Sequence, residues 1–473
     1  MEINFIGGSY EGRSKDLNSQ RCVNWYPVIG GQMEADKAPI AMFPTPGLKT
    51  WHTSATTAVV RGLHKYSTAD MLYAVIGDTL YSINTSSVAT SLGTLNSSTG
   101  VVYMADNGNV GNQLMIVDGA TGYIYNTSSG AFAAIADADF PGSGTLTWQD
   151  GYFIISRPST GQFWISASYD GTSWDATDYA TAESDPDNLL RVFSDHREVW
   201  LFGPTSIEVY YNSGATFPFA RKLDETIERG LGATASVAKE DNTVFWLDDQ
   251  GLARRAAGYK PEIISTRQIE YQWSTYSTIS DAIGFAYIQE GHTFYVLTFP
   301  TANKTWVYDI STGFWHERAS YPSPYTGRWR ANCHAFFNRL NLVGDFENGK
   351  IYELSLDTYK DNAKIIKRTR TTKFLHKDRK KIFHKSLEID FESGVGLVTS
   401  QGSDPQAMLS WTDDGHTWSN EHWRSIGKIG EYDRRSVWNR LGSSRNRAYK
   451  LEIADPVKAV IIGAHLESEM GRF

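Results

Sequence analysis

Cysteine is nearly absent from this chain: Cys22 and Cys333 are the only two among 473 residues, and they lie far apart in the sequence. A small secreted domain held together by disulfides is therefore excluded, and assembly in a reducing bacterial cytoplasm is expected. No run of about 18 or more apolar residues occurs, so no membrane anchor is predicted. The first residues show neither a basic stretch nor an apolar core, and we expect no signal peptide.

Sequence motifs for common catalytic and cofactor sites are missing as well. The chain has no His-Glu-x-x-His, no Cys-x-x-Cys and no Walker-type loop, and no Gly-x-Ser-x-Gly lies at a strand-to-helix elbow. Zinc, nucleotide and nucleophilic-serine chemistry therefore lack ligands at their usual spacing. The acidic residues around Asp404 and Asp413 do not form an EF-hand loop. We predict no cofactor, no metal site and no enzymatic activity.

Aromatic residues, in contrast, are abundant. They make up 13 % of the chain, with 25 Tyr, 22 Phe and 15 Trp, alongside 41 Gly, and apolar residues reach 41 %. This mixture suits pleated, half-buried surfaces joined by tight turns, so an all-β protein is predicted. The net charge of −8 argues against a protein coated with nucleic acid but allows a local basic patch.

One unit recurs from about residue 60 to residue 357: an apolar strand, a turn rich in Gly or Asp, and a second strand with aromatic residues. Successive copies are separated by 42, 39, 46, 45, 50 and 48 residues when seven apolar positions are taken as equivalent: Leu72, Leu114, Phe153, Val199, Val244, Phe294 and Leu342. A four-stranded propeller blade occupies about 40–50 residues. The spacing therefore predicts a β-propeller of about seven blades, six being possible, and an irregular pair of β-sandwiches is the alternative.

The composition changes after the last copy. Residues 364–385 carry ten Lys and Arg side chains against a single acid, Asp378, and residues 386–392 alternate with the period of a strand. Further strands are predicted at 407–411, 436–441, 448–453 and 459–466, which suggests a small β-sandwich. The predicted organisation is an N-terminal arm and propeller-closing segment (1–59), a β-propeller (60–360), a basic connector (361–385) and a C-terminal β-sandwich (386–473).

Several short stretches, in this order, resemble one known family. They are residues 21–27 (RCVNWYP), 43–48 (FPTPGL), 182–187 (AESDPD), 206–210 (SIEVY), 437–442 (VWNRLG) and 455–457 (DPV). Their order along the chain resembles that of the packaged-DNA stabilisation proteins, the tail-hub or head-completion proteins of short-tailed bacteriophages. The likeness touches both ends and the middle of the chain.

The resemblance implies a structural role in the virion. A protein of this family joins the phage tail below the portal and its adaptor ring as a homo-oligomer, expected to be a hexamer. The ring retains packaged DNA, which passes through its channel without sequence-specific binding, and it carries tail spike or fibre and plug or needle proteins. The alternative function is a carbohydrate-binding or glycosidase-like propeller protein.

The alternative rests on residues 413–418 (DDGHTW), which resemble the Asp-box of propeller glycosidases. That box is a structural hairpin turn even in those enzymes, and Trp411 stands where the box usually has Ser. Glycoside hydrolysis requires two carboxyl groups roughly 5–10 Å apart across the scissile bond. Neighbouring acids such as Asp413 and Asp414, or Asp248 and Asp249, diverge on a strand, and we expect them to serve turns.

Two basic stretches are the candidate contact sites. For the first we consider a solvated connector, an acidic partner surface, or phosphate contact with DNA; its candidate residues are Lys367, Arg368, Arg370, Lys377, Arg379, Lys380 and Lys381. The second is a short arginine cluster in the predicted sandwich, where guanidinium forks suit carboxylates on a partner, although solvated strand-edge charges fit as well. Its residues are Arg434, Arg435, Arg440, Arg445 and Arg447.

Overall fold

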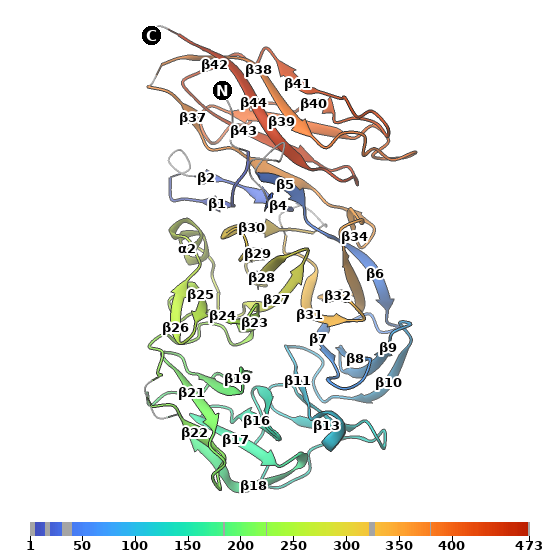
Figure 1. The fold of residues 1–473 in the computed structure, drawn as a ribbon, viewed down its shortest axis with the longest axis vertical. Coiled ribbons are helices and arrows are strands. Elements are labelled where there is room, and N and C mark those ends of the chain that lie inside the picture. The colour runs from blue at the N-terminus through green and yellow to red at the C-terminus, as the bar shows by residue number, and fades with distance from the viewer. Residues whose placement is uncertain are drawn as a thin grey trace.

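The computed structural model describes residues 5–14, 19–30, 40–182, 185–223, 225–320, 327–378 and 380–471. Within them the chain forms two bodies, a ring of β-sheets in the lower part of Figure 1 and a β-sandwich above it. Helices are few and short: α1 (Gly108–Gly111), the 3-10 helix η1 (Thr234–Ser236) and α2 (Arg267–Ser274). The predicted all-β class is confirmed.

Seven four-stranded blades form the ring in the described part of the chain. Blades 1 to 3 contain β7 (Val60–Lys65), β8 (Met71–Ile76), β9 (Thr79–Asn84) and β10 (Ala89–Thr94); β11 (Tyr103–Asp106), β12 (Gln113–Val117), β13 (Gly122–Asn126) and β14 (Phe132–Ala134); and β15 (Leu146–Gln149), β16 (Tyr152–Ser156), β17 (Gln162–Ala167) and β18 (Asp170–Thr181). Blades 4 and 5 contain β19 (Arg191–Asp195), β20 (Glu198–Phe202), β21 (Ile207–Asn212) and β22 (Phe219–Arg221); and β23 (Ala238–Glu240), β24 (Thr243–Leu247), β25 (Ala253–Ala257) and β26 (Lys260–Ile263). Blades 6 and 7 contain β27 (Ile283–Gln289), β28 (His292–Phe299), β29 (Lys304–Asp309) and β30 (Phe314–Arg318); and β31 (Ala331–Phe337), β32 (Leu340–Asp345), β33 (Lys350–Ser355) and β6 (Gly47–Thr53).

The seven positions that defined the repeat all lie on the second strand of a blade, and all are buried. Tight turns connect the first two strands of several blades. In blades 4, 5 and 7 the two turn residues both have positive φ, as at Asp241 (49°) and Asn242 (61°). Such type I′ turns match the twist of the flanking strands, so the register of these inner hairpins is fixed locally.

The apolar core of the ring lies between the blades. Each pair of neighbouring blades in the described chain shares one buried cluster, such as that of Trp200, Val209, Val244 and Trp246 between blades 4 and 5. The cluster between blades 7 and 1 joins Phe337 to Leu72 and closes the circle. This is the radial packing that a propeller requires, because a single sheet cannot bury both of its faces.

Ring closure depends on the N-terminal strand β6, which completes blade 7. It pairs antiparallel with β33, from Gly47 opposite Ser355 to Thr53 opposite Lys350. A Cβ at Gly47 would lie 2.2 Å from the carbonyl oxygen of Thr358. Glycine is therefore required at this close approach of two chain segments, inside the stretch 43–48 that supported the family resemblance.

The sandwich is built from both ends of the chain. One sheet has the order β4 (Trp25–Ile29), β5 (Ile40–Pro44), β44 (Ile461–Met470), β38 (Ile382–Phe391) and β41 (Ser436–Asn439), with β42 (Ser443–Ser444) also on β38. The other has the order β3 (Cys22–Val23), β36 (Arg368–Thr371), β43 (Asn446–Ile453), β39 (Gln406–Thr412) and β40 (His422–Ser425), with β37 (Leu375–His376) on β43. The remaining short strands are β1 (Tyr10–Glu11), β2 (Ser19–Gln20), β34 (Lys360–Asp361) and β35 (Lys364–Ile365).

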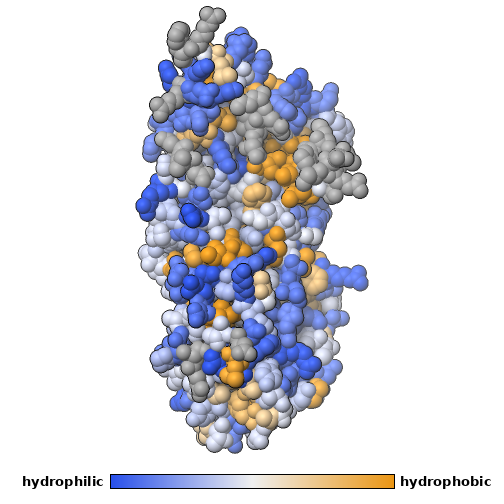
Figure 2. Space-filling model, turned by 60° about the vertical axis from the view of Figure 1, so that its left-hand side comes forward, coloured by the Kyte–Doolittle hydropathy of each residue, from blue (hydrophilic) through white to orange (hydrophobic). Residues whose placement is uncertain are grey.

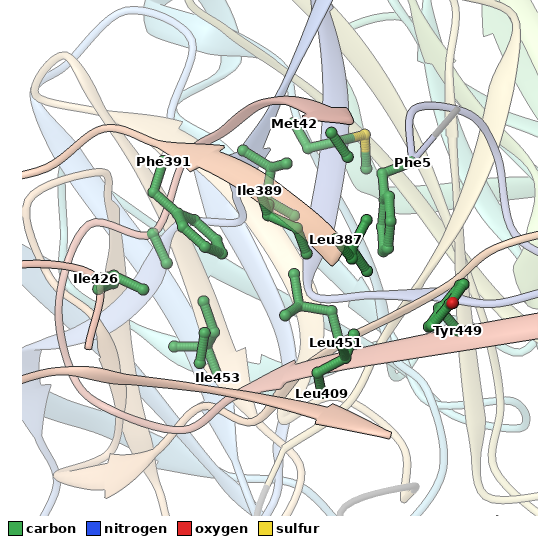
Figure 3. Packing of buried hydrophobic residues seen from close by; sticks show 14 of the residues in the cluster. Phe5, Met42, Leu387, Ile389, Phe391, Leu409, Ile426, Tyr449, Leu451 and Ile453 are labelled. Atoms are coloured by element: carbon green, nitrogen blue, oxygen red, sulfur yellow. The ribbon is translucent and has the colours of Figure 1, made fainter. Parts of the chain in front are cut away.

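Figure 3 shows the core between these two sheets, where Leu387 and Ile389 face Leu409, Leu451 and Ile453. Phe5 and Met42 from the N-terminal segment pack into the same cluster. The sequence ranges alone did not predict that N-terminal strands enter the sandwich, nor that β36 of the predicted connector is an internal strand.

The two bodies share one continuous sheet. Strand β3 pairs in parallel with β30 of blade 6 at Val23 and Glu317, and antiparallel with β36 at Cys22 and Arg370. The neighbouring residues lock this junction: the Asn24 amide donates to the carbonyls of Ala319 (2.9 Å) and Lys367 (2.8 Å). Trp25 is buried in the sandwich core and Tyr26 in the cluster between blades 6 and 7. The stretch 21–27 therefore joins propeller to sandwich.

Candidate docking site

The arginine cluster of the sandwich is divided by the fold into two groups. Arg434 and Arg435 precede β41, whereas Arg440 follows it, and the four-residue strand between them is about 13 Å long. Arg435 is exposed and donates to both oxygens of Glu388 on β38 (2.6 Å each). This ion pair lowers the pKa of the Glu388 carboxyl and raises that of Arg435.

Arg447 is buried, with only 3 % of its side chain exposed. It donates to both carboxylate oxygens of Asp413 (2.6 and 2.8 Å) and also to the carbonyl of Leu441. The side chain holds the turn after β39 against β43 and is not available to a partner. The predicted docking role is therefore corrected for Arg447.

The basic connector is also divided by burial. Arg368 and Arg370, both on β36, are fully buried. Lys367 pairs with Glu452 at 3.0 Å. Arg368 and Arg370 cannot reach DNA or an acidic partner, so the predicted contact role is corrected for both. Lys377, Lys380 and Lys381 are exposed after β37. Arg379 lies outside the described residues.

Arg370 has a structural role instead. Its guanidinium donates to the carbonyls of Phe5 (2.6 Å), Gly8 (3.0 Å) and Arg21 (3.2 Å) and to the side chain of Gln20 (3.2 Å). All four acceptors belong to the N-terminal segment. The side chain thus fastens that segment to β36.

Three exposed lysines of the first stretch and two exposed arginines of the second meet at one end of the sandwich, away from Arg434 and Arg435. Ile382 and Phe383, which follow the exposed lysines, pair with Ser444 and Ser443, and the Arg440 amide donates to the carbonyl of Lys385 (2.7 Å). In Figure 1 β42 lies near the top of the upper body and β37 on its left-hand side, both away from the propeller. We call this end of the sandwich the basic end; it consists of Lys377, Lys380, Lys381, Arg440 and Arg445.

Hydropathy alone does not single out a docking surface. Figure 2 shows that hydrophobic residues on the face in view form separate patches, at mid-height and in the upper body, among hydrophilic residues. Single exposed apolar side chains are normal for a soluble protein. Charge is therefore the clearer signal: the basic end gathers five exposed Lys and Arg side chains, beside the acids Asp378 and Glu469, in a chain whose net charge is −8.

The Asp-box-like turn uses its acids to hold itself together. One oxygen of Asp414 accepts hydrogen bonds from the backbone N–H groups of His416 (2.8 Å) and Thr417 (2.7 Å) and from the Thr412 hydroxyl (2.9 Å). These bonds keep the pKa of the Asp414 carboxyl well below its usual range. Asp413 is engaged by Arg447, so neither carboxylate is placed as a general acid.

The other acid pairs serve turns in the same way. Asp248 is fully buried, accepts from Arg254, and receives the backbone N–H groups of Gln250 and Leu252. The Thr205 hydroxyl is shared between Asp185 (2.7 Å) and Asp187 (3.0 Å). Across the described ranges, no group of three or more His, Cys, Asp and Glu side chains could hold a metal ion. No helix of the described chain is long and apolar enough to cross a membrane.

These observations define a class, an all-β protein in which a closed seven-bladed propeller shares a sheet with a sandwich. Two family models match the chain: "Bacteriophage P22 Gp10, beta-propeller" over residues 1–359 and "Bacteriophage P22 Gp10, beta-sandwich" over residues 367–469. The chain belongs to the bacteriophage P22 Gp10 family and is a phage structural protein, a component of the virion. The predicted family and the predicted propeller with a C-terminal sandwich are confirmed.

Comparison with solved structures yields more distant likenesses. The chain is similar to a selenomethionine-substituted virginiamycin B lyase from Staphylococcus aureus, with 11 % identity and a TM-score of 0.45 over 65 % of this chain and 98 % of that one. A streptogramin B lyase gives 10 % identity and a TM-score of 0.45 over 65 % and 97 %. Likeness at this level says nothing about activity. Among curated proteins, none matches the sequence.

Proposed function

We propose that this protein is a ring-forming hub subunit of a short phage tail, located below the portal and its adaptor ring, where it retains packaged DNA. The observation that supports this proposal is the match of both family models, in order, over nearly the whole chain. The ring is proposed to be a hexamer, assembled in the bacterial cytoplasm, that carries spike or fibre proteins and a plug or needle protein.

DNA is proposed to pass between copies of the chain and not through a single propeller. The axial cavity of the propeller is open to solvent and has a volume of about 500 Å³, which suits a small ligand. A duplex with its hydration shell does not fit there. The ring channel is therefore proposed to be formed by several subunits. It requires no tight phosphate binding, because DNA has to slide through it.

A mutant phage that lacks this protein is expected to package its genome and then lose it. In the proposed role, the protein closes the head-to-tail channel after packaging. Capsids that lack the protein should therefore fill with DNA and then leak it. Electron micrographs should show empty, tailless heads, and quantitative PCR of nuclease-treated particles should show DNA protected early in infection but not late. Stable DNA-filled heads in the mutant would contradict the retention role, and heads that never fill would indicate a role in packaging instead.

The basic end is proposed to dock to an acidic surface of another tail protein. Complementing the null mutant with the double reversal Lys381→Glu and Arg440→Glu should reduce infectious titre about tenfold or more, because like charges across an interface are strongly unfavourable. The purified variant should keep its circular dichroism spectrum and its urea midpoint, since both side chains are exposed.

The matched control is Arg434→Glu, an exposed arginine at the other end of β41. It should support titre within about twofold of the wild-type chain, because the proposed contact lies elsewhere. Normal yield from the double reversal, with the variant found in purified tails, would rule out docking through the basic end. An equal loss from Arg434→Glu would assign the effect to overall charge.

A further inference from the structure

The propeller contains an axial cavity that the proposed role in the tail does not use. The first strands of all seven blades line it: β7, β11, β15, β19, β23, β27 and β31. In Figure 1 most of these strands surround the centre of the lower body. Its volume of about 500 Å³ is within the range of small-molecule sites. Lys239 is exposed, so the cavity reaches solvent at the end where this side chain lies.

The charges around the cavity do not balance. Among the described residues that line it, three carry a permanent positive charge, Arg61, Arg191 and Lys239, and one is a carboxylate, Asp106. The carboxylate is already engaged, because Asp106 lies 2.7 Å from His64 Nε2 and accepts the Ser67 N–H (3.1 Å). His334, also on the wall, adds no charge at neutral pH, since burial lowers its pKa to about 4.

The hydrogen bonds of the three cations go to neutral groups, and the acids whose charge acts on Arg61, Asp78 and Asp118, do not line the cavity. Arg61 donates to the carbonyls of Gly77, Ser97, Thr99 and Gly100. Arg191 donates to the Thr234 carbonyl (2.8 Å), and its Nε is buried with no hydrogen-bond partner among the described residues. Lys239 donates to the Ser194 carbonyl (2.8 Å). Carbonyl oxygens satisfy hydrogen bonds but do not neutralise the charge, and burial lowers the pKa of Arg191 because it disfavours the charged form.

Aromatic rings surround the same cations. The Arg191 guanidinium lies 4.7 Å from the centre of the Tyr103 ring and 5.4 Å from that of Phe193. The Lys239 ammonium lies 5.7 Å from the Phe193 ring, and Trp148 and Phe285 complete an apolar wall. Apolar walls with a few convergent charged groups are the composition typical of ligand sites.

We propose that the axial cavity binds a small organic anion, a carboxylate or phosphate on a flat apolar body. The anionic group is held between Arg191 and Lys239, and the body stacks against Trp148 and its aromatic neighbours. Binding requires no bond to form or break. Because the site lies inside one subunit, this proposal is independent of the role proposed for the basic end.

Isothermal titration calorimetry of the intact protein tests the proposal with three probes: naphthalene-2-carboxylate, its uncharged amide, and inorganic phosphate. The carboxylate should bind saturably at one site per chain, and at least about tenfold more tightly than the amide, because a charge-assisted hydrogen bond is lost with the neutral probe. Inorganic phosphate should bind more weakly than the naphthoate, since it has no body to stack.

Arg191→Gln and Lys239→Gln should each weaken carboxylate binding about tenfold or more, and bring its affinity close to that of the amide. Arg197→Gln is the matched control: it lies on the turn after β19, its side chain is 84 % exposed, and it is not part of the wall. This variant should bind like the wild-type chain. Lys239 is exposed, so its variant keeps the test valid if Arg191→Gln does not fold.

Three outcomes would overturn the proposal. They are no saturable binding of naphthalene-2-carboxylate, equal binding of the acid and the amide, and carboxylate binding that Lys239→Gln leaves unchanged. Inorganic phosphate binding as tightly as the naphthoate would overturn the assignment of an organic ligand and leave a bare anion site.

Discussion

Replacing Arg370 with methionine is expected to lower the free energy of unfolding by about 3 kcal/mol. The variant leaves three carbonyls and one amide oxygen of the N-terminal segment without the guanidinium that they share. Each buried acceptor left unpaired costs about 1–3 kcal/mol. Part of this loss is offset, because burial already makes the charged side chain costly and lowers the pKa of Arg370. Urea unfolding of the purified protein measures the difference.

The N-terminal segment should also become the first site of proteolysis in this variant, because Arg370 fastens it to β36. Lys373→Met is the matched control: it lies two residues beyond β36 and is exposed, so it should change the free energy of unfolding by less than about 0.5 kcal/mol. If Arg370→Met is as stable as Lys373→Met, the N-terminal segment is held by its strand pairing alone.

Acid is expected to destabilise the sandwich through His384. This side chain is 2 % exposed and binds the Ser444 hydroxyl and the Tyr449 hydroxyl (2.9 Å each). Burial, with a smaller effect of Arg447, lowers its pKa from 6.5 to about 4. Because the unfolded chain binds a proton at higher pH than the folded chain, stability is lost as pH falls from about 6.5 towards 4. The loss at pH 4.5 is about 2.5 kcal/mol relative to pH 7.

The test uses urea unfolding to compare how the free energy of unfolding depends on pH in His384→Gln and in the wild-type chain. Other groups titrate in both proteins, so their contributions cancel in the difference. The wild-type chain should lose about 2.5 kcal/mol more than the variant between pH 7 and pH 4.5. His376→Gln, at an exposed position on β37, is the matched control, and its free energy of unfolding should change with pH as it does in the wild-type chain. Parallel curves for the wild-type chain and His384→Gln would show that the folded protein accepts the proton at no cost.

The propeller could be predicted from sequence because each blade repeats the same local pattern. The buried second strand and its hairpin partner are neighbours in the chain, as in Val244 to Leu247 beside Ala253, so spacing alone reveals the blades. The pairing of β6 with β33, which closes the ring, could not be predicted in the same way. Leu48 pairs with Leu354, about 300 residues later, and nothing near residue 48 encodes that partner.

Burial of the arginines was the main feature that sequence reasoning missed. Arg368 and Arg370 alternate with Thr369 and Thr371 on β36, a pattern that normally places charge towards solvent. Here the strand is internal, and carbonyls of the N-terminal segment and of Asp455 accept from the two arginines. The alternation can be read from the sequence, but the distant segments that cover the two arginines cannot. The exposed basic end was found only when the strand pairing of β38 and β42 brought two separate stretches together.

The N-terminal strands can pair fully only after residues near the other end of the chain have been synthesised. Residues 22–23 pair with Glu317 and Arg370, and Met42 with Ile461, so their partners emerge roughly 300–420 residues later. At about 5–20 residues per second, β3 and the outer edge of the β4–β5 hairpin wait roughly 15–80 seconds for these partners. Exposed strand edges are templates for aggregation during that interval. The last strand made, β44, then completes a sheet that β4 and β5 began.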